Sequence, residues 1–65
     1  QEEYYENVIK KSKNIYMVFN PISSRNLKFS DFVDRLTSDG FDVEYSCEHE
    51  ESENCNKILY ASCLN

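Results

Sequence analysis

The chain contains 65 residues with a formal net charge of −5, three cysteines, one histidine and a single glycine. A chain this short supports only one hydrophobic core, so residues 1–65 are expected to form a single small domain. A domain of this size usually needs a disulfide, a metal ion or a partner subunit. The 40% apolar content excludes a disordered acidic tail, and the longest apolar run, residues 15–19, is too short to span a membrane.

The first predicted element is a helix over residues 2–13, because apolar residues recur at helical spacing and no glycine or proline interrupts them. These apolar positions are Tyr4 or Tyr5, Val8 and Ile9. Acidic residues come first and lysines last, an order that suits the helix dipole. Glu6 and Lys10 are expected to form an ion pair one helical turn apart.

Residues 15–19 read Ile-Tyr-Met-Val-Phe and predict a strand with apolar side chains on both faces. We therefore expect this strand to be covered on both sides and to lie in the centre of a sheet. Asn20 and Pro21 are expected to end the strand, because proline has no N–H to donate to a neighbouring strand. Residues 22–26 follow as a loop.

Residues 31–39 are predicted to form a second helix, with Ser30 as the N-terminal capping residue. Asp31 and Arg35 lie one turn apart and are expected to form an ion pair. Gly40 is expected directly after this helix, where the backbone adopts the left-handed conformation that glycine tolerates best.

Two further strands complete the chain. Residues 41–46 alternate apolar and polar side chains, which predicts a strand with one face open to water. Residues 58–62 predict the last strand, with Leu59 and Ala61 on one face and Ile58 and Tyr60 on the other. The order helix-strand-helix-strand-strand predicts an α+β domain in which two helices cover a three-stranded mixed sheet.

The order of the strands within that sheet has two candidates. If the strands at 15–19 and 41–46 share a sheet, the helix between them makes a right-handed parallel crossover. Expected burial of both faces favours the order 2-1-3, with the first strand central. The adjacency of consecutive strands favours 1-2-3, which stays open.

The stretch Cys-Glu-His-Glu-Glu-Ser-Glu-Asn-Cys at residues 47–55 joins the last two strands. A disulfide between Cys47 and Cys55 is favoured, because cysteines at the ends of facing strands can reach the Cα separation of ~5.5 Å that a bridge needs. A bridge from Cys55 to Cys63 is the alternative. Otherwise Cys63 is a surface thiol or a link between two chains of a homodimer.

Two chemical functions of this stretch are alternatives to the disulfide. A zinc site would use Cys47, His49 and Cys55, together with Cys63, but the spacing lacks the paired C-x2-C motif. Cys47 with His49 resembles a thiol nucleophile and its base, but the neighbouring glutamates disfavour a thiolate and no oxyanion donor is evident. We therefore expect no catalytic residue, no bound metal and no cofactor.

Charge is distributed unevenly along the chain, since residues 7–28 contain only basic charges and residues 29–65 are mainly acidic. The glutamates between the two cysteines are either a solvated loop that aids solubility or a surface that docks a basic protein. If they form a docking surface, the partner-binding residues are Glu48, Glu50, Glu51 and Glu53. A pI of about 4.6 argues against direct contact with nucleic acid.

The favoured function is a non-enzymatic protein-binding module, secreted or extracellular, that acts as an effector, ligand or inhibitor through an acidic surface. The N-terminal Gln1 and the three cysteines favour this location. The first alternative is a cytosolic acidic inhibitor that occupies the basic surface of a nucleic-acid-binding protein. The second is a small zinc-binding module.

Overall fold

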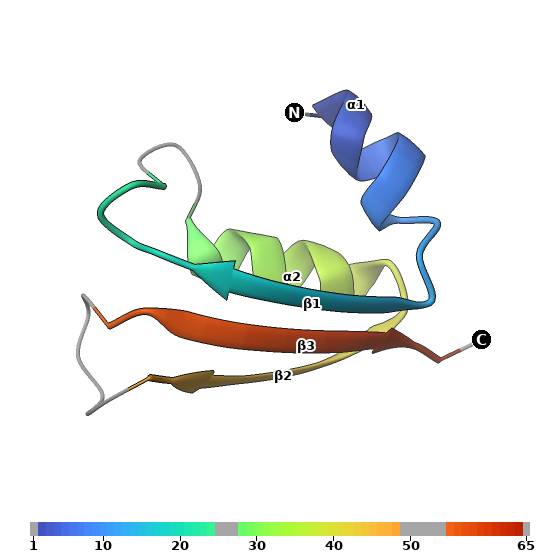
Figure 1. Cartoon of the computed structure of the whole chain (residues 1–65). Coiled ribbons are helices and arrows are strands. Elements are labelled where there is room, and N and C mark those ends of the chain that lie inside the picture. The colour runs from blue at the N-terminus through green and yellow to red at the C-terminus, as the bar shows by residue number, and fades with distance from the viewer. Residues whose placement is uncertain (1, 25–27, 49–54, 65) are drawn as a thin grey trace.

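A computed structural model describes residues 2–24, 28–48 and 55–64, and it contains a three-stranded sheet with its helices on one face (Figure 1). In chain order the elements are α1 (Glu2–Tyr4), the π-helical η1 (Tyr5–Ile9), β1 (Asn14–Phe19), α2 (Phe29–Ser38), β2 (Phe41–Cys47) and β3 (Lys57–Cys63). The predicted α+β class is confirmed. No helix in these ranges is long and apolar enough to cross a membrane.

The strands lie in the order β1-β3-β2, and both neighbouring pairs are antiparallel (Figure 1). The predicted mixed sheet is therefore wrong, as are both predicted strand orders. β1 and β2 run in the same direction and are joined by α2, but they are separated by the width of one strand. β3 fills that gap, because the chain reverses after β2 and returns antiparallel to both neighbours.

The side chains of the sheet divide between a covered face and an open face. On the covered face Leu59 is opposite Met17 on one side and Tyr45 on the other. The core lies between the helices and the sheet, and it consists of Tyr5, Phe32, Leu36, Phe41, Leu59 and Ala61. Tyr16 and Val18, which were expected to be buried, are 69% and 58% exposed. That expectation fails because both helices lie on the same side of the sheet.

The N-terminal helix ends earlier than the predicted residue 13. Its π-helical turn is closed by the Lys10 N–H, which donates to the Tyr5 carbonyl at 2.8 Å. Farther along, the Lys13 carbonyl already accepts a hydrogen bond from the N–H of Cys63 at 2.8 Å, so the chain must leave the helix to join the sheet. The predicted ion pair between Glu6 and Lys10 is present at 3.6 Å.

The second helix starts earlier than predicted, and Ser30 lies within it rather than capping it. Packing decides this start, because the ring of Phe29 contacts Phe19 and Tyr45 at centroid distances of 5.2 and 4.9 Å. At the other end Gly40 has a φ of 95°, as the sequence predicted.

Candidate functional site

The acidic connection between β2 and β3 is closed by a disulfide between Cys47 and Cys55, whose Cα atoms lie 5.7 Å apart. Glu48 is exposed, and its N–H donates to the Asn56 carbonyl at 2.9 Å, which continues the pairing of the two strands. His49 and the other three predicted partner-binding residues, Glu50, Glu51 and Glu53, lie outside the described residues.

The disulfide limits the chemistry available at this end of the sheet. Sulfur atoms that are bonded to each other are neither thiolate ligands nor nucleophiles, so the zinc and thiol interpretations would require the reduced protein. Cys63 is a half-buried free thiol, opposite Phe41 and at the other end of β3 from this bridge. Among the described residues no group of three or more potential ligands could hold a metal ion.

The open face of the sheet combines apolar and acidic side chains. The register aligns Tyr16, Tyr60 and Glu44 in one row across the strands, and Val18, Ile58 and Ser46 in the next. A third row consists of Asn14, Ser62 and Asp42. Aromatic and aliphatic groups therefore occupy β1 and β3, whereas the exposed carboxylates of Asp42 and Glu44 occupy β2.

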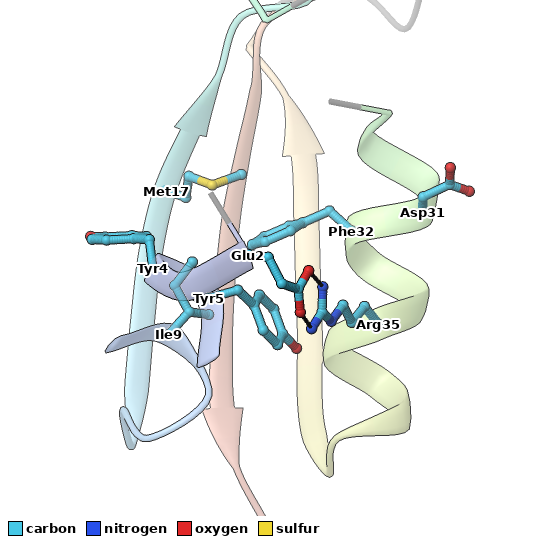
Figure 2. Close-up of a pocket in the computed structure, with 8 residues that line it drawn as sticks. All are labelled: Glu2, Tyr4, Tyr5, Ile9, Met17, Asp31, Phe32 and Arg35. Carbon is cyan, nitrogen blue, oxygen red and sulfur yellow. Dashed lines mark hydrogen bonds and ion pairs between the residues drawn. The ribbon is translucent and has the colours of Figure 1, made fainter. Parts of the chain in front are cut away.

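A cleft of about 460 Å³ lies between the N-terminal helix, β1 and α2 (Figure 2). Its lining residues are Glu2, Tyr4, Tyr5, Ile9, Met17, Asp31, Phe32 and Arg35. Figure 2 shows the carboxylate of Glu2 joined to the guanidinium of Arg35 at the cleft, whereas Asp31 points away from this pair. The walls are mainly apolar and aromatic, as in pockets for small apolar groups.

One basic side chain, Arg35, connects the N-terminal helix to α2. Its guanidinium donates to both carboxylate oxygens of Glu2 and, at 2.9 Å, to Glu6. It also stacks on the ring of Tyr5 at 3.8 Å, and the Tyr5 hydroxyl donates to Asp39 at 2.5 Å. We call these five residues the Arg35 latch. The predicted pairing of Arg35 with Asp31 is wrong.

The latch perturbs the protonation of its members. Hydrogen bonds from Arg35 lower the pKa of the Glu2 carboxyl and, reciprocally, raise the pKa of the guanidinium. Burial is the main cause that raises the pKa of the Tyr5 hydroxyl, and its hydrogen bond to Asp39 adds to this effect. Because Arg35 is engaged by two carboxylates of the N-terminal helix, the latch holds that helix to α2.

Sequence reasoning missed the latch because its partners are 29 to 34 positions apart along the chain. Helical spacing reveals only pairs within one helix, and no local pattern marks contacts between two helices. The open face was predicted only in part. The alternating pattern of β2 placed its carboxylates on a face open to water, whereas both faces of β1 were expected to be buried.

No protein-family model matches the chain, and no match is found among curated proteins or solved structures. A functional assignment therefore depends on the chemistry of the chain's own surfaces.

Proposed function

We propose that this protein is a non-enzymatic binding module whose open sheet face contacts a protein partner with a basic surface. The observation that carries the proposal is the side-by-side arrangement of exposed apolar groups on β1 and β3 with exposed carboxylates on β2. Contiguous exposed apolar groups bordered by polar ones are typical of interaction surfaces.

The apolar part of this surface supplies the contact area. Tyr16 and Val18 are more than half exposed, and Tyr60 is 44% exposed with its hydroxyl donating to Asn14 at 3.0 Å. Such groups gain free energy when a partner removes them from water, and tyrosine loses little conformational entropy on binding.

The acidic part selects the partner's charge. Asp42 and Glu44 project from one strand on the same face, and the protein carries a net charge of −5. A partner with lysines or arginines would be attracted from a distance and oriented on docking, whereas an acidic partner would be repelled. Glu48 follows β2 and extends the acidic surface toward the disulfide.

The disulfide supports a secreted or extracellular setting, because such bonds persist in oxidising compartments and are uncommon in the cytosol. It joins the ends of β2 and β3 and so limits relative movement of two of the three strands beneath the proposed surface. A surface that is fixed before binding loses less entropy when a partner docks.

A helical peptide with lysines along one stripe and leucines along the adjoining stripe is a suitable probe, because it presents a basic row beside an apolar row. In an NMR titration we expect shifts at Glu44 and Tyr60 and none at Asp34, which is exposed on α2. Glu44→Lys should weaken binding about tenfold, equivalent to ~1.4 kcal/mol.

Asp34→Lys is the matched control, since it changes the net charge by the same amount on the other side of the sheet, and it should bind as the wild type does. Equal weakening by both variants would mean that net charge alone attracts the peptide. Shifts confined to α2, or equal binding of a peptide with glutamate in place of lysine, would also contradict the proposal.

A further inference from the structure

The two edge strands of the sheet differ in how they are protected against pairing with another strand. β2 carries the carboxylates of Asp42 and Glu44, and α2 packs against it. β1, in contrast, has no charged residue, no proline and no break in its register between Asn14 and Phe19. Charges, prolines and bulges are the usual features that prevent edge pairing, and β1 lacks all three.

The register identifies which backbone groups of β1 point outward. Because the Cys63 N–H donates to the Lys13 carbonyl, these two residues form a hydrogen-bonded pair. Such pairs alternate along an antiparallel ladder, so Ile15, Met17 and Phe19 bond to β3. The N–H and C=O groups of Asn14, Tyr16 and Val18 therefore face the free edge, and within the described residues β3 is the one strand paired with β1.

We propose that this edge binds the same edge of a second copy, so that two sheets join antiparallel through β1 with Tyr16 opposite Tyr16 of the second copy. In this register Asn14 lies opposite Val18 of the second copy, and the reverse pair is equivalent by symmetry. Every outward N–H and C=O of the three residues then has a partner.

The side chains favour the same pairing. Tyr16 and Val18 are among the most exposed large apolar residues of the described chain, and cross-strand pairing would place each beside a side chain of the second copy while leaving the open face of the sheet free. On the covered side, Tyr4 is 61% exposed, and Figure 2 shows its ring extending past β1 on the side away from β3. The edge is thus bordered by apolar groups on both faces, which the same groups of a second strand would contact.

Charge and symmetry also fit a second copy. No charged side chain of one β1 would lie opposite a like charge of the other, whereas β2 edges would oppose carboxylates. Joined through β1, the two sheets would hold Asp42 and Glu44 at opposite outer edges. The contact uses the same surface on both chains, so it closes at two copies and does not propagate into a filament.

The experiment measures mass by light scattering over a concentration series, using Cys63→Ser so that no disulfide joins two chains. We expect the mass to rise from one chain to two and to stop there. Amide hydrogen exchange should show protection of Tyr16 and Val18 that increases with concentration, whereas Met17, bonded to β3, should be protected throughout. One-chain mass at all concentrations, or growth beyond two chains, would overturn the proposal.

Charge substitutions test the register. Tyr16→Lys and Tyr16→Glu should each weaken dimerisation at least ~10-fold, since like charges then meet at the symmetry axis, and an equimolar mixture of the two should restore it. Ser46→Lys, on the open face of β2, is the matched control and should dimerise normally. Failure of the mixture to restore the dimer would refute this register, as would an equal effect of Ser46→Lys.

Val18→Pro provides a second test of the edge, because it removes an outward N–H and no bond to β3. This variant should keep its circular dichroism spectrum and remain a single chain. A folded Val18→Pro protein that still dimerises would place the contact elsewhere.

Discussion

The loop between β2 and β3 is closed by a covalent bond between cysteines eight positions apart. The N-terminal helix, by comparison, is held to α2 by hydrogen bonds, ion pairs and a stacked guanidinium whose partners are about four times more distant in sequence. The first link is local and strong, whereas the second is long-range and made of several weak interactions. Both links add stability to a chain whose small core supplies little on its own.

The two links should therefore tolerate different conditions. A disulfide does not respond to salt or moderate pH and fails when reduced. Ion pairs between exposed groups are screened by salt, and hydrogen bonds to titratable groups depend on pH. We therefore expect redox conditions to control the β2–β3 end and pH to control the N-terminal helix.

The largest expected effect is removal of the disulfide. Cys47→Ser combined with Cys55→Ser should lower the free energy of unfolding by about 2.5 kcal/mol, because a nine-residue ring no longer restricts the unfolded chain. Urea denaturation measures this loss, and reduction of the wild-type protein should reproduce it. Cys63→Ser is the control, since that thiol is free. A similar loss in the control would show that the effect comes from replacing cysteine rather than from opening the ring.

A smaller effect is expected from the one buried member of the latch. Tyr5→Phe keeps the ring that packs edge-on against Phe32 and removes the hydrogen bond to Asp39, so it should cost about 1 kcal/mol at neutral pH. Urea denaturation of the two proteins at neutral pH measures this difference directly.

The same variant isolates a pH dependence. The raised pKa of Tyr5 means that the unfolded chain loses this proton first, so stability is complete below about pH 10 and falls above it, by at most ~1.4 kcal/mol per pH unit. Denaturation curves recorded from pH 9 upward, a range set by the ordinary tyrosine pKa of about 10, should therefore show a steeper decline for the wild type than for Tyr5→Phe. Parallel declines would show that ionisation of Tyr5 does not cause the loss of stability at high pH.

The two linking regions also differ in what the sequence could predict. The disulfide followed from the spacing of Cys47 and Cys55 at the ends of two patterned strands, which is local information. The order of the strands did not follow, because nothing in the pattern of Ile15–Phe19 distinguishes a central strand from an edge strand with apolar residues on its open face. Periodicity reports which side chains share a face and leaves open what covers that face.

The helix boundaries show the same limit. Gly40 ended α2 as predicted, because a left-handed backbone is a local requirement. Ser30 failed as a cap because Phe29, packed between aromatic rings of β1 and β2, extended the helix toward its N-terminus. A tertiary contact thus overrode a local preference, and the pairing of Arg35 with Glu2 in place of Asp31 has the same cause.

The smallest expected effect concerns the exposed part of the latch. Glu2→Gln removes the charge that Arg35 binds, whereas Glu3→Gln removes an equal charge from a neighbouring exposed position with no ion pair of its own among the described residues. Glu2→Gln should lower the Tm slightly and increase hydrogen exchange in η1, and Glu3→Gln should do neither. If both variants behave alike, the helix is held by the burial of Tyr5 rather than by this ion pair.

The pH dependence of that small effect has a defined sign. Because the pKa of Glu2 is lowered in the folded protein, the stabilisation is complete above the ordinary glutamate value of 4.5 and is lost as the pH falls below it. The difference in Tm between the wild type and Glu2→Gln should therefore disappear in acid and also decrease in high salt, since the pair is exposed. The loss caused by opening the disulfide should persist under both conditions, so acid and salt separate the electrostatic link from the covalent one.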